Sequence, residues 1–433
     1  MGIKKYYIET YGCQMNVADS ELVAGLLKRQ NYRSTNSPAE ADIILVNTCS
    51  VRQGAEQRAL ARLAQFKYYK QQNPELILGL IGCVAQRDRG KLIKEKQFID
   101  LVLGPDTYRR LPEIVANKKL PLIDTHLSKE ETYQDLLPFR QTRVNAWVSI
   151  MRGCNKFCSF CIVPFVRGRE RSRPVDSIIN EIRQAVSNGF QEITLLGQNV
   201  NSYQYHEFRF PELLTAVAGV KGVKRIRFTS PHPADVDDQM LRVMSESENI
   251  CHHIHLPLQA GSAAVLQRMN RGYTPEQYLD LVQKIRKYLP DCAISTDIIV
   301  GFPGETDGDL NQTLYIMDQV IFDNAFMFKY SVRPGTLAAK MIDDVTNEEK
   351  AERLNQVIMK QKEHTLIRNQ ALIGSRQLVL IDGLSKKNKQ EVIGRTDSNK
   401  QVVIKAGSAQ IGDFVKVDII DAAGVSLFGI MNS

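Results

Sequence analysis

The chain has 433 residues, of which 43% are hydrophobic and 24% charged, and its formal net charge is +8. This length allows two or three domains, and the composition is that of a globular protein, which excludes fibrous and disordered classes. No apolar run reaches the roughly 18 residues that a membrane helix needs, and residues 1–9 lack the apolar core of a signal peptide. We therefore expect a cytoplasmic protein, whose moderate positive charge permits a polyanionic partner without requiring one.

Residues 1–125 predict an α/β domain built on a doubly wound parallel sheet. Short apolar strands are predicted at 3–9, 42–46, 76–81 and 99–103, separated by helical segments at 56–71 and 111–115. A further helix is predicted after the first strand, with Asp19, Ser20 and Glu21 as its N-terminal cap.

A cysteine follows each of the first three predicted strands: Cys13, Cys49 and Cys83. Because the carboxyl ends of parallel strands meet at one edge of a sheet, these three thiols can lie together. The alternative is that each one is a small buried hydrophobic residue. Eight cysteines in a chain without an export signal favour metal or catalytic use over disulfides.

Residues from about 126 to 142 are polar and poorly periodic, and we expect them to link two domains. In the second domain, residues 143–370, six strands are predicted near 144–151, 192–197, 224–230, 251–258, 293–300 and 324–331, with helices between them. This pattern predicts an open partial (βα)6 barrel, in which functional groups lie at the carboxyl ends of the strands.

The first strand of this barrel leads into a loop that carries Cys154, Cys158 and Cys161. Three thiolates so close together favour a soft metal. A structural zinc site would need a fourth ligand, and the next histidine is His206. An iron–sulfur cube takes four cysteines, so three would leave one iron open. The alternatives are an incomplete zinc site or three buried free cysteines.

Small and amide residues occupy the other strand ends of the predicted barrel, where they allow close approach of, and hydrogen bonds to, a nucleoside-like ligand. They are Gly197, Gln198, Asn199, Ser230, Gln259 and Asp297. Four alternating arginines, Arg167, Arg169, Arg171 and Arg173, form either a basic rim or a solvated edge. His252, His253 and His255 are expected to pack or to contact substrate.

Residues 371–433 predict a small antiparallel β-barrel of five strands. Its loops are basic, and small barrels with basic loops frequently bind nucleic acid, although a plain β appendage is the alternative. The candidate RNA-binding residues of the chain are Arg167, Arg169, Lys386, Lys387, Arg395 and Lys400.

The C-x-x-x-C-x-x-C run at Cys154, Cys158 and Cys161 resembles the radical S-adenosylmethionine (SAM) superfamily. The resemblance implies a [4Fe-4S] cluster whose open iron binds SAM and splits it into methionine and a 5′-deoxyadenosyl radical. It also implies that Phe160 packs near the adenine and that the strand-end residues named above form the SAM cradle.

Three further stretches, 9–16, 47–50 and 82–86, are similar to the N-terminal domain of the methylthiotransferases. That resemblance implies a second [4Fe-4S] cluster on Cys13, Cys49 and Cys83, facing the first cluster across the domain interface. The stretches 382–387 and 394–400 look like the TRAM domain, an RNA-binding module.

Within this family, the stretches 12–16, 197–202 and 269–273 are similar to the branch that acts on N6-dimethylallyladenosine in tRNA, although Ala260 stands where that branch more often has serine. The resemblance implies methylthiolation of carbon 2 of this adenosine, a tRNA anticodon stem-loop as substrate, and an electron donor such as flavodoxin or ferredoxin. We also expect a monomer, although the sequence does not reveal the oligomeric state. A threonylcarbamoyladenosine or a ribosomal protein as substrate, and a non-catalytic RNA-binding iron–sulfur protein, are the alternatives.

Overall fold

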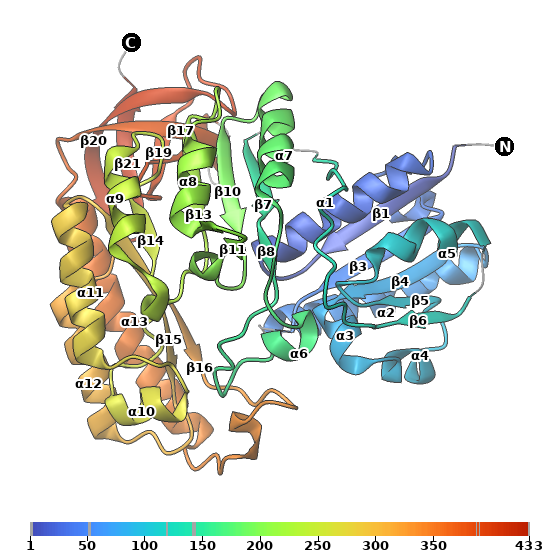
Figure 1. Ribbon diagram of the computed structural model, residues 1–433, viewed down its shortest axis with the longest axis horizontal. Coiled ribbons are helices and arrows are strands. Elements are labelled where there is room, and N and C mark those ends of the chain that lie inside the picture. The colour runs from blue at the N-terminus through green and yellow to red at the C-terminus, as the bar shows by residue number, and fades with distance from the viewer. Residues whose placement is uncertain are drawn as a thin grey trace.

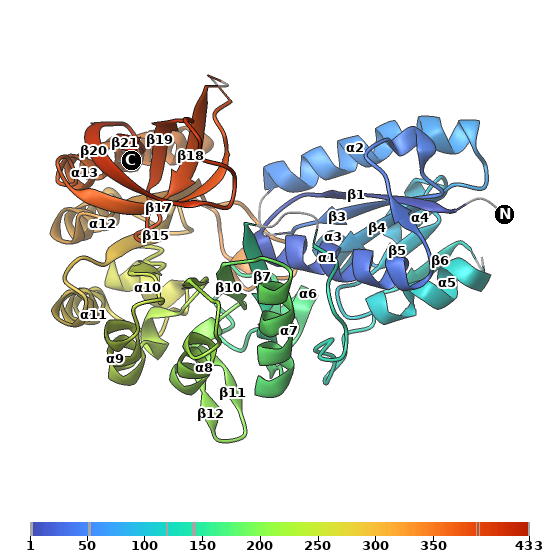
Figure 2. The same cartoon turned by 90° about the horizontal axis from the view of Figure 1, so that it is seen from above.

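The computed structural model describes residues 3–50, 53–117, 120–140, 144–386, 388 and 390–431. Three parts follow one another along the chain (Figure 1): an N-terminal sheet with its helices, a central partial barrel, and a C-terminal β-barrel packed on one end of the central part. Figure 2 shows the N-terminal and C-terminal parts on different sides of the central part. Within the described ranges, no helix is long and apolar enough to cross a membrane.

The N-terminal sheet has six parallel strands in the order β2-β1-β3-β4-β5-β6. They are β1 (Lys5–Thr10), β2 (Arg33–Ser34), β3 (Ile43–Thr48), β4 (Ile77–Gly82), β5 (Leu101–Leu103) and β6 (Leu122–Asp124). The four predicted strands are confirmed, and the short edge strands β2 and β6 were not predicted. The strand order reverses between β1 and β3, which is where open parallel sheets bind ligands.

Helices cover both faces of this sheet, so the doubly wound arrangement is confirmed. They are α1 (Gln14–Arg29), α2 (Gln53–Gln72), α3 (Cys83–Asp88), α4 (Lys91–Glu95) and α5 (Leu111–Asn117), with the short 3-10 helices η1 (Pro38–Glu40) and η2 (Tyr108–Arg110). Strand β3 is buried on both sides, because Ile43 packs into the core with α1 and α5 while Ile44 packs into the core with α2.

Helix α1 begins earlier than predicted. Its N-cap is Cys13, and Asp19 lies inside the helix, fully buried, so the predicted cap at Asp19 is wrong. The segment after β6 packs against this part of the molecule. Tyr133 and Leu136 join the core on the α1 side, and the Phe139 amide donates to the Glu21 carbonyl at 2.8 Å.

The six predicted strands of the central part are confirmed. They are β7 (Asn145–Ser149), β10 (Glu192–Leu196), β13 (Arg225–Phe228), β14 (His253–His255), β15 (Ala293–Val300) and β16 (Asn324–Lys329). They form two parallel three-stranded sheets, β13-β10-β7 and β14-β15-β16, which an isolated parallel bridge between Ile226 and Ile250 joins. The result is an open partial barrel with one continuous core.

Helices cover the outside of the partial barrel (Figure 1). They are α7 (Val175–Ser187), α8 (Phe210–Ala218), α9 (Asp238–Glu246), α10 (Ala263–Arg268), α11 (Pro275–Tyr288), α12 (Asp307–Val320) and α13 (Asn347–Gln370). The short helix α6 (Val163–Arg167) lies instead against α3 of the N-terminal part. Helix α11 shows how local sequence sets these elements. Thr274 caps it, Pro275 opens it, and Tyr278, Val282 and Ile285 face the core at helical spacing.

The C-terminal part is a closed five-stranded barrel in the order β17-β18-β19-β21-β20, as predicted. Its strands are β17 (Arg376–Leu384), β18 (Glu391–Arg395), β19 (Gln401–Lys405), β20 (Phe414–Ala423) and β21 (Ser426–Met431). Four of its strand pairings are antiparallel, as predicted, whereas the pairing of β19 with β21 is parallel, which was not predicted.

Candidate metal centres between the N-terminal sheet and the partial barrel

The structure brings Cys13, Cys49 and Cys83 together at the carboxyl edge of the N-terminal sheet. Cys13 follows β1 and caps α1, Cys49 follows β3, and Cys83 follows β4 as the first residue of α3. A hydrogen bond joins Cys13 to Cys49, and the Cys13 charge also acts on Cys83. We call these three residues the auxiliary triad.

Two glycines make the close approach of these cysteines possible. Gly12 has a φ of +127°, and a Cβ there would lie 2.2 Å from the Cys49 Cβ. Gly82 has a φ of +93°, and a Cβ there would lie 2.4 Å from the Asn47 Oδ1. A side chain at either position would force the strand ends apart, so glycine is needed where the backbone meets its neighbour.

The auxiliary triad is buried and electrostatically asymmetric. The hydrogen bond with Cys49, the Arg167 charge and the first backbone amides of α1 lower the pKa of Cys13 to about 6, against the effect of burial. Burial raises the pKa of Cys83, and Arg167 opposes that shift. The Cys13 thiol is therefore more easily ionised than an ordinary cysteine.

Cys154, Cys158 and Cys161 lie in one loop between β8 (Met151–Arg152) and α6; we call them the radical triad. The Cys154 amide donates to the Gly168 carbonyl at 3.1 Å, and the Cys161 amide donates to the Cys158 carbonyl at 2.9 Å. Arg271 donates from Nη1 to the Cys158 Sγ at 3.2 Å. Sequence analysis did not identify Arg271 as a partner of this triad, although it lies within the 269–273 stretch.

The thiols of the radical triad are neighbours: the Cys158 charge acts on both Cys154 and Cys161, and the Cys154 charge acts on Cys161. Burial, with smaller contributions from the neighbouring cysteines, raises the pKa of Cys154 to about 11 and that of Cys161 to about 12. Phe160 adds apolar cover through an edge contact with Phe302, with ring centroids 6.5 Å apart. Binding of a metal must therefore displace protons from these thiols.

Both triads fit the same kind of group. Among the residues that the structure describes, no set of three or more cysteine, histidine or carboxylate side chains is arranged around a single metal ion. Each triad instead offers three clustered thiols, which match three of the four corners of an iron–sulfur cube.

A buried network of ion pairs connects the N-terminal part to the central part beside the auxiliary triad. Asp19 of α1 accepts from Arg152 at 2.9 Å and from Arg167 at 2.8 Å, while Asp106 accepts from Arg171 at 2.7 Å. Asp106 also lies 3.5 Å from the Nε of Arg152, and all five residues are buried. Two carboxylates of the N-terminal part thus bind three arginines of the central part.

The burial of three of the four alternating arginines corrects their interpretation as an exposed basic rim or a solvated edge. Arg167, Arg171 and Arg173 are only 3%, 7% and 4% exposed, so they cannot form an exposed basic surface. Arg167, a candidate RNA-binding residue, instead bonds Asp19 and the Cys83 Sγ. Arg169 is exposed and lies over the Phe157 ring at 4.1 Å.

The strand ends near the radical triad carry two buried amide oxygens, those of Gln198 and Gln259, that have no partner among the described residues. Ser230 and Gln259 adopt positive φ values of 61° and 68°, a conformation that few non-glycine residues take. A Cβ on Gly197 would lie 2.7 Å from the Met151 side chain. This rim therefore has acceptors and close backbone approaches available to a nucleoside-like ligand.

Two other predicted rim residues have partners. Asn199 is buried, donates to Asp235 at 2.8 Å and accepts from the His232 amide at 3.2 Å, so it holds the rim together. Asp297 lies 3.3 Å from the His255 ring, and His253 and His255 both contact Ser295.

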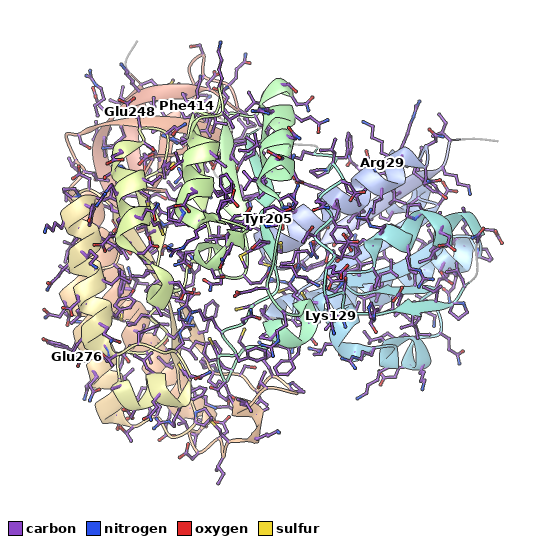
Figure 3. The ribbon with its side chains drawn as sticks, viewed as in Figure 1. Arg29, Lys129, Tyr205, Glu248, Glu276 and Phe414 are labelled. Carbon is purple, nitrogen blue, oxygen red and sulfur yellow. The ribbon has the colours of Figure 1, made fainter. Side chains whose placement is uncertain are left out.

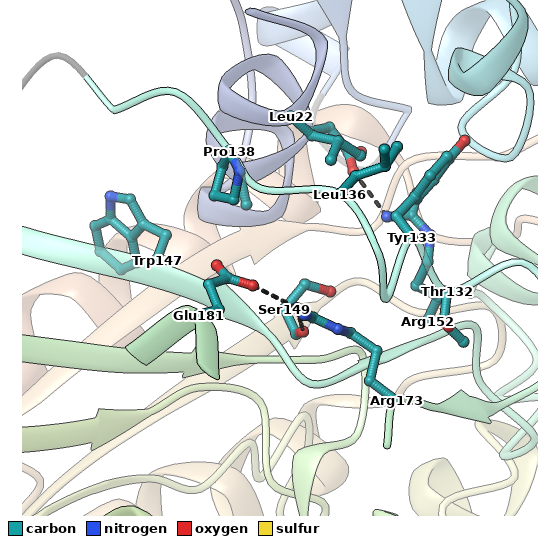
Figure 4. Close-up of a pocket in the computed structure, with 12 residues that line it drawn as sticks. Leu22, Thr132, Tyr133, Leu136, Pro138, Trp147, Ser149, Arg152, Arg173 and Glu181 are labelled. Carbon is teal, nitrogen blue, oxygen red and sulfur yellow. Dashed lines mark hydrogen bonds and ion pairs between the residues drawn. The ribbon is translucent and has the colours of Figure 1, made fainter. Parts of the chain in front are cut away.

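A small cavity lies beside the network, between α1, the segment before β7, and the start of the partial barrel (Figure 4). Its volume is about 30 Å³, enough for a single water. Glu181 and Arg173 form an ion pair at 2.7 Å in its wall. This cavity is too small for SAM or a nucleotide.

Two arginines of the partial barrel bind main-chain carbonyls of the C-terminal barrel. Arg225 donates to the carbonyls of Leu378 and Arg395, and Arg227 donates to those of Thr396 and Asp397, at 2.6–2.8 Å. The Phe414 ring, labelled in Figure 3, lies 4.9 Å from the Arg225 guanidinium. The 394–400 stretch therefore docks the barrel.

The predicted RNA-binding residues of this barrel have different environments. Lys400 pairs with Asp323 of the central part at 2.7 Å and is nearly buried, which corrects its assignment to an open RNA-binding loop. Arg395 is half-exposed and pairs with Asp382 at 2.8 Å. Lys386 is exposed, and Lys387 lies outside the described residues.

Three family models match the chain: the radical SAM superfamily over residues 148–314, the Uncharacterized protein family UPF0004 over 5–104, and the TRAM domain over 370–431. Among solved structures, the radical SAM methyltransferase TsrM from Kitasatospora setae, with cobalamin and a [4Fe-4S] cluster bound, is similar in fold. Its TM-score is 0.56 at 11% identity, over 78% of this chain and 77% of that one. The cobalamin-dependent SAM radical enzyme OxsB gives a TM-score of 0.53 at 12% identity, over 83% of this chain and 56% of that one.

Curated relatives are similar over nearly the whole length. The tRNA-2-methylthio-N(6)-dimethylallyladenosine synthase of Porphyromonas gingivalis (strain W83) is 49% identical over 98% of this chain and 94% of its own. The synthase of the same name from Bacteroides fragilis (strain NCTC 9343) is 47% identical over 98% of this chain and 95% of its own. With two cysteine triads at one interface and this identity, the chain belongs to the tRNA-2-methylthio-N(6)-dimethylallyladenosine synthase family of radical SAM enzymes.

Proposed function

We propose that the two triads divide the methylthiolation of tRNA between them. The radical triad holds the [4Fe-4S] cluster that binds SAM, and the auxiliary triad holds a second [4Fe-4S] cluster that carries the sulfur. The observation that supports this division is the position of Arg167, which ends the helix that follows the radical triad and bonds Cys83 of the auxiliary triad. In this proposal the auxiliary-cluster domain is 1–125, the radical SAM domain is 143–370, and the RNA-binding barrel is 371–433.

When bound, the two clusters and SAM supply sulfur methylation and the one-electron cleavage that functionalises carbon 2 of the adenine. The chain supplies position and shielding. Three thiols hold each cluster, and the amide oxygens of Gln198 and Gln259, with Ser230, line the rim for SAM. Phe160, packed on Phe302, covers the adenine side, and the buried network keeps water from the space between the triads.

The substrate of this reaction is the anticodon stem-loop of tRNA, with dimethylallyladenosine beside the anticodon. Arg169, Lys386 and Arg395 are the exposed or half-exposed basic residues assigned to its backbone. Arg169 stands beside the radical triad, so it suits a nucleotide entering the site. An acidic one-electron donor such as flavodoxin or ferredoxin, a monomeric enzyme and a cytoplasmic location complete the proposal.

Replacement of each triad by alanine tests the division of labour. Without Cys154, Cys158 and Cys161, about four of the roughly eight irons expected for two cubes should remain, and SAM cleavage should be lost. Without Cys13, Cys49 and Cys83, about four irons should again remain, and reduced protein should cleave SAM without thiolating tRNA. An auxiliary-triad variant with full iron that still makes methylthiolated tRNA would contradict the proposal.

A further inference from the structure

Each triad has one cysteine that accepts a hydrogen bond from a buried arginine. In the auxiliary triad, Arg167 donates from Nε to the Cys83 Sγ at 3.3 Å. In the radical triad, Arg271 donates from Nη1 to the Cys158 Sγ at 3.2 Å. Both arginines are nearly inaccessible to solvent, at 3% and 6% exposure, so neither contact is a surface accident.

Other contacts hold both guanidinium groups in place. Arg167 bonds Asp19 at 2.8 Å and the Asn16 side chain at 3.2 Å. Arg271 bonds the Tyr273 hydroxyl at 3.1 Å and the Pro257 carbonyl at 3.2 Å. A donor fixed in this way directs its N–H at the sulfur with little freedom to turn away.

Arg167 has a spare hydrogen-bond donor. Its Nη1 is buried and has no partner among the described residues. The surrounding network holds three arginines, Arg152, Arg167 and Arg171, against two carboxylates, so it keeps one excess positive charge. An oxidised four-iron cube on three thiolates carries roughly one net negative charge, which this excess would balance.

We propose that Arg167 and Arg271 are positioning residues that serve one cluster each. Each fixes the direction of one ligand sulfur and raises the reduction potential of the cluster it contacts, because hydrogen bonds to sulfur and nearby positive charge stabilise the reduced cluster. This inference rests on the proposed function, since it requires a four-iron cluster on each triad.

The test compares arginine variants by redox titration monitored by electron paramagnetic resonance. Arg167→Gln and Arg167→Lys are made in full-length protein whose radical triad is alanine, so that only the auxiliary cluster gives a signal. Arg271→Gln and Arg271→Lys are made in the converse background. Each Gln variant should lower the midpoint potential and keep about four irons, and each Lys variant, which retains the charge but not the fork, should lower it less.

Arg171 and Arg353 provide matched controls. Both are buried and bond carboxylates, Arg171 with Asp106 at 2.7 Å and Arg353 with Asp307 at 2.9 Å, and neither has a bond to a cysteine among its contacts in the described structure. Arg171→Gln removes one positive charge from the same network but no bond to sulfur, so it should lower the midpoint potential clearly less than Arg167→Gln. Arg353→Gln is the equivalent control for Arg271.

The outcomes separate this inference from the proposed function. If the parent backgrounds lack four irons each, the assignment of the two clusters fails. If the iron is present but the Arg167 or Arg271 variants leave the potential unmoved, or their controls shift it equally, the positioning inference fails alone. Should Arg167→Gln not fold, Arg167→Lys and the two Arg271 variants still decide the question.

Discussion

Replacing Gly12 by alanine should remove the auxiliary cluster and leave the radical cluster in place. A Cβ at this position would lie 2.2 Å from the Cys49 Cβ, whereas ordinary contact begins at 3.4 Å. The segment that holds Gly12 or the segment that holds Cys49 must therefore move by about 1.2 Å. The φ of +127° adds a backbone cost of about 1–3 kcal/mol for any residue other than glycine. A site must hold its ligands to within about 0.5 Å, so the displacement is too large for Cys13 and Cys49 to bind one cluster.

The expected result is a fall from about eight irons to about four, together with loss of at least about 100-fold in methylthiolation. Cleavage of SAM by the reduced protein should persist, because the contact lies in the auxiliary triad. Iron analysis, 5′-deoxyadenosine release and mass spectrometry of tRNA nucleosides measure these three quantities on one preparation.

Gly189→Ala is the matched control. Gly189 also has a positive φ, +92°, but a Cβ there would meet nothing within 4 Å. The Gly189→Ala protein should therefore be destabilised only by its backbone conformation and should keep both clusters. If Gly12→Ala retained eight irons and normal tRNA modification, or if Gly189→Ala lost as much iron, the steric argument would be refuted.

Three further changes test other parts of the structure. Gln198→Ala removes a buried amide oxygen that has no partner among the described residues, so calorimetry should show about tenfold weaker SAM binding with iron content unchanged. Arg227→Met leaves the Glu192 carboxylate buried and unpaired, so urea unfolding should show a loss of about 3–5 kcal/mol, part of which Glu192→Gln in the same chain restores; a loss below about 1 kcal/mol would contradict this. Burial raises the pKa of Glu21 from 4.5 to about 7 despite Arg140, so the folded state keeps a proton there that the unfolded state releases. The unfolding free energy should therefore fall by about 2–3 kcal/mol as pH rises from 4.5 to 7, and Glu21→Gln should lack that decline; equal slopes in both proteins would count against it.

The strands and the cysteine triads could be predicted from sequence because their signals are local. Apolar runs of strand length mark β3 and β4, and a cysteine follows each of them directly. The close spacing of Cys154, Cys158 and Cys161 likewise predicts a metal cluster from a stretch of only eight residues.

The start of α1 could not be predicted, because Asp19, Ser20 and Glu21 resemble a helix cap while Cys13 does not. Asp19 instead lies inside the helix, where it bonds Arg152 and Arg167, which are 133 and 148 residues away in the sequence. A carboxylate with such distant partners looks the same in sequence as one exposed to solvent.

The prediction that these basic residues are exposed was wrong for the same reason. Alternation marked four arginines as one set, yet Arg169 is exposed while Arg167 and Arg171 are buried against Asp19 and Asp106, and nothing in the sequence shows that a second domain covers those two. Lys400 belongs to a loop with the composition of an RNA-binding loop, yet its partner is Asp323 of the partial barrel.

The docking of the C-terminal barrel has a consequence for chimeric enzymes. Arg225 and Arg227 bind the main-chain carbonyls at 378 and 395–397 and no side chain of those residues. Two side chains of the same stretch also bond the central part, because Asp397 accepts from the His252 amide at 2.7 Å and Lys400 pairs with Asp323 at 2.7 Å. The fit therefore depends on the path of the loop and on these two side chains. A barrel grafted from a distant relative should seat correctly if its loop has the same length and turn and keeps the aspartate and lysine, whereas one residue inserted just before Arg395 would misalign the three carbonyls at 395–397 at once.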